Sequence, residues 1–156
     1  MTIAVIGAGA SGMMAALTAA EQPENEILLF ERQARVGRKL AVTGNGRCNL
    51  TNTGAAPGNY HGAQPDFAAP ALAAFPPAAA LDWFAAHGLM TVTEPGGRVY
   101  PLSNAANSVV DVLRFALARP NITLRAGEAV TAVRRQGRGF VIETEHETIP
   151  AGRVII

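Results

Sequence analysis

The sequence has a single cysteine, few aromatic residues and almost no excess of charge of either sign. Cys48 is alone among 156 residues, so no internal disulfide can form and the cysteine framework of small secreted domains is missing. This usage fits a reducing compartment, and we expect a cytoplasmic protein. Lys and Arg number 13 against 12 Asp and Glu. Because nucleic-acid binding usually needs a strong basic excess, we expect no nucleic-acid partner.

Targeting and metal-binding patterns are also missing. The first 20 residues are largely apolar, but no cluster of positive charge precedes them, as a secretory signal would require. Glycines interrupt the same stretch, which a strand, turn and helix explain better than a membrane span. The histidines His61, His87 and His146 are too scattered to form a metal site. We therefore expect no signal peptide, no membrane association and no bound metal.

What is present is a chain that is 49% hydrophobic and long enough for one packed domain. Thr2–Ile6 and Glu26–Phe30 are short apolar runs typical of buried parallel strands. Ser11–Glu21 lies between them and is rich in helix-forming residues. Strand, glycine turn, helix and strand in this order predict a βαβ unit.

The remainder is predicted to be helical first and β-rich afterwards. We expect three parts: 1–50 with the βαβ unit and a following loop, 51–119 mostly helical, and 120–156 returning to the parallel sheet. The predicted helices are two short ones in Asp66–Gly88, broken at Pro76-Pro77, and one in Asn104–Ala118. The predicted strands are Met90–Thr93, Arg98–Tyr100, Ile122–Arg125, a hairpin of Ala129–Arg134 with Phe140–Thr144, and Arg153–Ile156.

The turn after the first predicted strand matches the pattern G-x-G-x-x-G. Gly7 allows a tight turn, Gly9 lets a pyrophosphate approach the backbone, and Gly12 allows the helix to pack closely on the strands. Ser11 would open the helix directly after Ala10, and both are candidate cofactor-binding residues because the free amides and partial positive charge at this helix end attract phosphate. The pattern is specific here because a strand precedes it and a helix follows.

An acidic residue stands where this motif requires one. Glu31 ends the second predicted strand, about 20 residues beyond the glycines. Its carboxylate would accept hydrogen bonds from the adenosine ribose hydroxyls and would repel the 2′-phosphate of NADP. We include the neighbouring Arg32 among the candidate cofactor-binding residues. The alternative is an ordinary surface glutamate paired with that arginine.

The stretch Gly37–Asn52 places glycines and asparagines among cations. Such a loop can present backbone amides and side-chain donors to an anionic or polar ligand, whereas the alternative is a flexible basic loop. Cys48 lies within it, and we interpret it as a small buried residue in preference to a redox thiol.

At these residues the sequence resembles the YhiN/BaiN-like flavoproteins, which are FAD-dependent oxidoreductases of the two-dinucleotide-binding-domain group. The similarity covers Gly7–Gly12, Glu31, Gly37–Asn52, Gly97–Pro101 and Ser103–Leu113. It implies an α/β, Rossmann-like FAD-binding domain with a parallel sheet and a small antiparallel β insertion. Family members are considerably longer, so we interpret the chain as a truncated N-terminal portion.

The resemblance also implies roles for particular residues. The glycine motif would hold the pyrophosphate and Glu31 the ribose, while no catalytic residue is implied. Arg38 and Lys39 would neutralise phosphate or stabilise a reduced, anionic flavin. Thr43, Gly44, Asn45 and Gly46 would line the path toward the isoalloxazine, and Val130 would contact adenine.

The predicted function is therefore the FAD-binding N-terminal part of a flavin-dependent oxidoreductase, with NAD(P)H as a candidate reductant. We expect this part to be inactive alone, and its small-molecule substrate cannot be derived from the sequence. Two alternatives stay open: an NAD-dependent dehydrogenase, and a non-catalytic nucleotide-binding fragment. The second would form a homo-oligomer by pairing its last strand with another copy.

Overall fold

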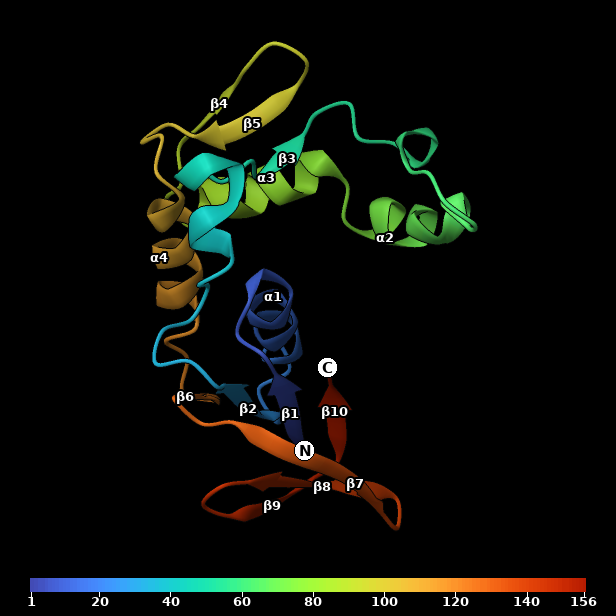
Figure 1. Cartoon of the computed structure of the whole chain (residues 1–156), viewed down its shortest axis with the longest axis vertical. Helices are drawn as coiled ribbons and strands as arrows, with labels where there is room; N and C mark the ends of the chain where they lie inside the picture. Colours follow the sequence, from blue (N-terminus) through green and yellow to red (C-terminus); the bar gives the residue numbers. More distant parts are fainter. The chain divides into compact units, whose positions relative to one another are not determined.

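The computed structural model describes all 156 residues, which form two compact units (Figure 1). Unit 1 combines Met1–Leu40 with Leu113–Ile156, and unit 2 is Ala41–Val112. Unit 1 thus contains both ends of the chain, and unit 2 is an insertion between them.

Unit 1 is built on a four-stranded parallel sheet in the order β10-β1-β2-β6. Its strands are β1 (Thr2–Ile6), β2 (Glu26–Glu31), β6 (Ile122–Ala126) and β10 (Arg153–Ile155). Helix α1 (Ala10–Ala19) connects β1 to β2, which confirms the predicted βαβ unit. The helix begins one residue before the predicted start, because Gly9 serves as its N-cap.

Both faces of this sheet are covered at its two central strands, which explains why β1 and β2 are largely apolar. Successive side chains of a strand point to opposite faces. Ala4, Leu28 and Phe30 pack on one face against Ile142 and Ala151 of the antiparallel sheet. On the other face, α1 contacts β1 and β2 and buries its own apolar residues.

The antiparallel sheet of unit 1 contains β7 (Val130–Gln136), β8 (Gly139–Thr144) and β9 (Thr148–Ala151) in sequential order. It is the predicted small β insertion, and β7 and β8 form the expected hairpin. Ile142 of β8 is fully buried, and burying such a side chain contributes about 1.5–3 kcal/mol. This packing holds the start of β7 beside the parallel sheet.

Unit 2 contains a three-stranded antiparallel sheet in the order β3-β5-β4. Its strands are β3 (Thr51–Asn52), β4 (Thr91–Thr93) and β5 (Arg98–Pro101). The predicted pair around Pro95-Gly96-Gly97 is confirmed as β4 and β5. The pairing of β3 with β5 was not predicted, since two residues are too few to show a strand periodicity.

Prolines set the boundary between two helices of unit 2. Helices α2 (Ala69–Ala74) and α3 (Pro77–Ala86) are separated at Pro76, which is extended and caps α3, as predicted. Three short 3₁₀ segments precede them: η1 (Leu40–Gly46), η2 (Pro57–Asn59) and η3 (Pro65–Ala68). Helix α4 (Ala106–Ala116) leads back to unit 1. None of the helices combines the length and the apolar character needed to cross a membrane.

Candidate functional site

The turn between β1 and α1, Gly7–Gly12, is called the glycine turn below. Gly7 has φ of +97°, a conformation that strains any other residue, and its amide donates to the Phe30 carbonyl at 2.8 Å. A Cβ on Gly12 would lie 1.8 Å from the Gly7 carbonyl oxygen. Gly12 therefore brings α1 against the turn, as the motif predicts.

Gly9 differs from Gly12 because it faces open space. A Cβ built on Gly9 would have no atom within 4 Å. The first intrahelical bond runs from the Met13 amide to the Gly9 carbonyl at 2.9 Å, so the amides of Ala10, Ser11 and Gly12 have no partner within the helix. Free amides beside an open backbone form a cradle that fits a phosphate group.

The Glu31 carboxylate faces this turn directly. One oxygen accepts a hydrogen bond from the Ala8 amide and the other from the Gln33 amide, each at 2.9 Å. Each carboxylate oxygen has a second lone pair, so both can still accept from a ligand hydroxyl. The acid at the end of β2 and the glycine turn therefore form one site, with the Ala8 amide already engaged.

The cations predicted to assist this site are exposed. Arg32, Arg38 and Lys39 all lie at the surface of unit 1. Arg38 donates from Nη1 to the Gln33 side-chain oxygen at 2.8 Å. The Gly37 amide, just before Arg38, donates to the Ala8 carbonyl at 2.8 Å. This bond ties the segment that carries Arg38 and Lys39 to the glycine turn.

Val130, the predicted adenine contact, is the first residue of β7. The turn before it lies along the end of β2, because the Gly127 amide donates to the Gln33 carbonyl at 2.9 Å and the Glu128 amide to the Glu31 carbonyl at 3.0 Å. Val130 therefore lies two residues after Glu128, whose amide contacts the backbone of Glu31.

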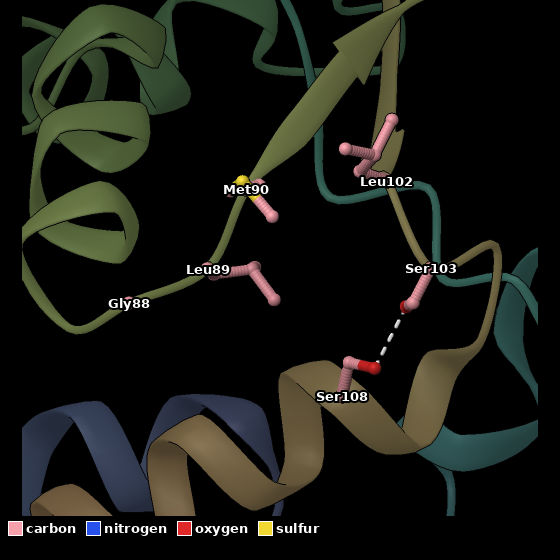
Figure 2. A pocket seen from close by; sticks show the side chains of 6 residues that line it. All are labelled: Gly88, Leu89, Met90, Leu102, Ser103 and Ser108. Atoms are coloured by element: carbon pink, nitrogen blue, oxygen red, sulfur yellow. Dashed lines mark hydrogen bonds between the residues drawn. The ribbon is translucent and has the colours of Figure 1, made fainter.

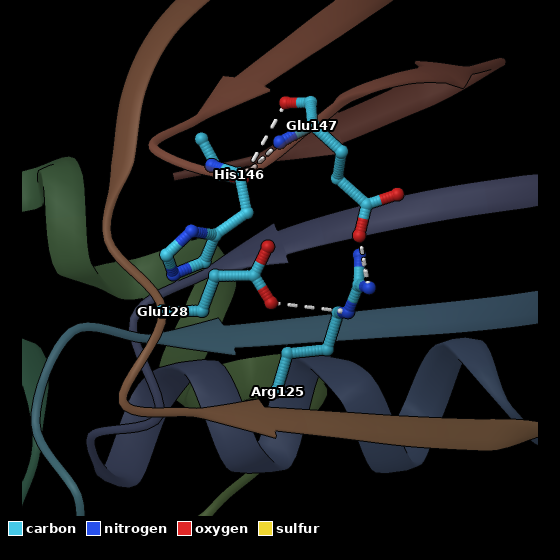
Figure 3. A network of polar contacts seen from close by, with 5 residues as sticks. Arg125, Glu128, His146 and Glu147 are labelled. Carbon is cyan, nitrogen blue, oxygen red and sulfur yellow. Dashed lines mark hydrogen bonds and ion pairs between the residues drawn. The ribbon is translucent and has the colours of Figure 1, made fainter.

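A charged network fixes this same turn (Figure 3). Arg125 lies 3.2 Å from a carboxylate oxygen of Glu128 and also pairs with Glu147. The second oxygen of Glu128 is buried and has no hydrogen-bond partner. The sequence did not indicate the contact with Glu147, which lies 22 residues from Arg125.

Unit 2 holds the other predicted residues in a segment with unusual backbone, Thr43–Cys48, called the arch below. Gly44, Asn45, Gly46 and Cys48 all have φ between +55° and +81°. A Cβ on Gly44 would lie 2.8 Å from the Asn49 amide nitrogen. The backbone of the arch therefore folds closely on itself, and its exposed residues are Gly44, Asn45 and Gly46.

Arg47 anchors the arch, a role that no sequence pattern indicated. Its guanidinium donates to the side chains of Asn104 and Glu94 and stacks on the Tyr100 ring, 4.0 Å from the ring centroid. The hydrogen bond with Glu94 raises the pKa of Arg47 above its ordinary value. Cys48, next in sequence, is buried, as predicted.

A separate hollow in unit 2 has a volume of about 330 Å³. It is lined by Gly88, Leu89, Met90, Leu102, Ser103 and Ser108 (Figure 2). The two serine hydroxyls share a hydrogen bond of 2.7 Å. None of the predicted cofactor-binding residues lies in this hollow.

Comparison with solved structures identifies related folds. p-Nitrophenol 4-monooxygenase PnpA from Pseudomonas putida superposes with a TM-score of 0.61 at 16% identity, over 98% of this chain and 40% of that one. L-Proline dehydrogenase from P. horikoshii gives 0.55 at 16% identity, over 99% and 22%. At this identity the likeness establishes the fold.

Comparison with curated sequences gives closer relatives. The chain is 39% identical to 3-dehydro-bile acid delta(4,6)-reductase of Clostridium scindens over 155 residues, which is 99% of this chain and 38% of the relative. It is 31% identical to ribosomal RNA dihydrouridine synthase of Escherichia coli, over 97% of this chain and 38% of the relative. The chain thus spans well under half the length of these relatives.

The family comparison covers the whole sequence. The family model described as "HI0933-like protein Rossmann domain" matches residues 1–156. This result and the two relatives confirm the resemblance that the glycine turn, Glu31 and the arch carry. The chain therefore belongs to the HI0933-like Rossmann-domain family, the group of the YhiN/BaiN-like flavoproteins.

Proposed function

We propose that this chain is the FAD-binding N-terminal part of a flavin-dependent oxidoreductase. The carrying observation is the contact between Glu31 and Ala8, which fixes a carboxylate beside an open glycine turn. A diphosphate needs amides without competing side chains, and a ribose needs an acceptor for its hydroxyls. Unit 1 supplies both the open amides and the acceptor carboxylate, and the hydrogen bond from Ala8 to Glu31 joins them.

Individual residues divide the binding work. The amides of Ala10, Ser11 and Gly12 would donate to the pyrophosphate, and Gly9 leaves room for its approach. The Glu31 carboxylate would accept from the ribose hydroxyls. Arg32, Arg38 and Lys39 would add positive charge near the phosphates, and the backbone at Val130 would meet adenine. These roles complete the ADP half of the site inside unit 1.

The residues of unit 2 would serve the flavin ring. Thr43, Gly44, Asn45 and Gly46 would present backbone and side-chain polar groups toward it. When bound, FAD supplies hydride and single-electron transfer, which the side chains of this chain do not provide. The work of the arch is to orient the ring and exclude water from one side of it.

The names of the relatives suggest the direction of the reaction. One is a reductase of a 3-dehydro-bile acid and the other makes dihydrouridine, which is a reduced uridine. We therefore propose reduction of an organic substrate by the flavin, with NAD(P)H as the candidate source of electrons. With a net charge of +1, this part of the protein is not expected to hold RNA.

Titrating the purified chain with ADP, FAD and NADH tests this function. We expect ADP to bind, and FAD to bind weakly because this chain spans only 38% of its relatives. A protein of the relatives' full length should purify with a flavin absorption spectrum. Failure of the full-length protein to bind FAD under any condition would refute the proposal.

The same titration separates the alternatives. Preference for NADH over FAD would favour a dehydrogenase, although that function leaves the arch unexplained. Size-exclusion chromatography of the chain tests the self-associating fragment, since a monomer would argue against pairing through β10. A gel-shift titration with ribosomal RNA at physiological salt should show no complex, and a tight complex would contradict the expected absence of nucleic-acid binding.

A further inference from the structure

We propose that Arg47 is a positioning residue that holds the arch in its left-handed conformation. The inference rests on the proposed function in one respect, namely that the arch faces the flavin. The evidence for Arg47 itself comes from contacts within unit 2 and needs no ligand.

The arch stores backbone strain. Asn45 and Cys48 have φ of 56° and 59°, although neither is glycine. Such residues persist in this region only when their surroundings over-determine the conformation, and they cluster at functional sites. A cause for the strain must therefore lie in the contacts around the arch.

Arg47 supplies those contacts from the middle of the strained segment. Glu94 lies 47 residues away in the turn after β4, Asn104 lies 57 residues away, and Tyr100 belongs to β5. Three partners from separate segments fix the guanidinium in position and plane. Since Arg47 lies between Gly46 and Cys48, holding its side chain restrains the backbone on both sides.

The chemistry of these contacts requires arginine. A guanidinium is planar, donates in several fixed directions and stacks on aromatic rings, whereas an ammonium is a compact point charge. Lysine at this position could pair with Glu94 but could not also stack flat on Tyr100. Arg47 is therefore distinct from Arg38 and Lys39, which are exposed at the surface of unit 1.

The arch contains a built-in reporter of its own conformation. In an Asn-Gly pair, the glycine nitrogen attacks the asparagine Cγ, a C–N bond forms and ammonia leaves. Water then opens the cyclic imide to aspartate or isoaspartate. Ring closure needs the Gly46 nitrogen to eclipse the Asn45 Cβ, and at ψ of 41° they are far from eclipsed. The held arch should therefore resist this reaction.

The experiment measures isoaspartate at Asn45 by mass spectrometry during incubation of the chain without flavin. We expect the folded chain to react more slowly than the same chain in urea. Arg47→Ala should accelerate the reaction about tenfold, which corresponds to the loss of about 1.4 kcal/mol of restraint on the arch. Arg47→Lys should fall between the two, and Glu94→Gln should give a smaller increase than Arg47→Ala.

The matched control is Arg98→Ala, which removes an exposed cation at the start of β5 and should leave the rate unchanged. Thermal melting identifies any variant that fails to fold. If Arg47→Ala does not fold, the isoaspartate rates of Glu94→Gln and Arg47→Lys test the role of Arg47 instead. Equal rates in the folded and unfolded chain, or an unchanged rate in Arg47→Ala, would overturn the inference.

Adding FAD to the wild-type chain separates this inference from the proposed function. If the arch meets the flavin, FAD should slow isoaspartate formation further. The positioning role is supported if FAD no longer slows isoaspartate formation in Arg47→Ala but still slows it in Arg98→Ala. Absence of any protection by FAD in the full-length protein refutes flavin contact by the arch, while the rates without flavin still decide the role of Arg47.

Discussion

The carboxylate of Glu31 accepts a hydrogen bond from the amide of Ala8 at 2.9 Å. This contact joins the end of β2 to the turn after β1 without any ligand. Because the Gln33 amide holds the second oxygen at 2.9 Å, the carboxylate is fixed on both sides. A group held in place beforehand lowers the entropy lost on binding, so the candidate site in unit 1 is preorganised for the proposed ligand.

Replacing Gly9 and Gly12 by alanine should have opposite consequences. An added Cβ at Gly9 meets no atom, so Gly9→Ala should change the free energy of unfolding by about 1 kcal/mol or less. The substitution should lower the affinity for ADP at least about tenfold, because the methyl group blocks the space through which the pyrophosphate approaches the backbone. Isothermal titration and urea denaturation measure the two effects.

Gly12→Ala is the matched comparison. Its methyl group would lie 1.8 Å from the Gly7 carbonyl oxygen, so helix and turn must separate. We expect a loss of about 1–3 kcal/mol in the free energy of unfolding. If Gly9→Ala bound ADP as the wild type does, the phosphate would not pass over Gly9.

Glu31→Gln tests the carboxylate. The amide group keeps one acceptor oxygen but turns an NH₂ toward one of the two backbone donors, so one charge-assisted bond is lost. We expect the free energy of unfolding to fall by about 1–3 kcal/mol and the affinity for ADP to fall with it. The control is Glu26→Gln at the exposed start of the same strand, which should change neither. Unchanged ADP affinity in Glu31→Gln would remove the ribose role.

The glycine turn and Glu31 were predictable from sequence because local rules determine them. Gly7 has a positive φ that favours glycine, Gly12 leaves no room for a side chain, and the spacing from Gly12 to Glu31 follows from one helix and one strand. The two central strands, β1 and β2, were equally clear, since burial on both faces makes each of them a largely apolar run.

Contacts between distant segments were not predictable in the same way. Arg47 lies among other cations in the sequence, and nothing nearby indicates that Glu94 and Asn104 are its partners. The left-handed conformation of Asn45 and Cys48 was equally hidden, because neither residue type requires it. Tertiary contacts determine both features, and a single sequence does not display them.

Arg125→Ala should destabilise unit 1 because it leaves Glu128 without its ion-pair partner. Removing the guanidinium leaves the Glu128 carboxylate, whose side chain is only 14% exposed, without its counter-ion. We expect a loss of about 1–3 kcal/mol in the free energy of unfolding, measured by urea denaturation. The double variant Arg125→Ala/Glu128→Ala should recover part of this loss, because no buried charge remains unpaired. Additive losses in the double variant would show that the two side chains are not coupled.

The thiol of Cys48 should react slowly with alkylating reagents, at a rate that depends on pH. Burial raises the pKa of Cys48, and a hydrogen bond with Thr43 offsets part of that rise. Since the thiolate is the reactive form, iodoacetamide should label the folded chain more slowly than the urea-unfolded chain, with its labelling profile displaced to higher pH. Identical profiles in the two states would contradict a raised pKa.

The same shift has a thermodynamic consequence with a definite sign. A pKa raised by folding means that the folded chain holds the proton more tightly than the unfolded chain. Its contribution to stability is therefore complete below the unfolded thiol pKa of about 8.5 and is lost as the pH rises through the folded value. Cys48→Ser removes this titration, so the stability of the wild type should fall more steeply with alkaline pH than that of the variant. Parallel pH profiles of the two unfolding free energies would show that the thiol titrates alike in both states.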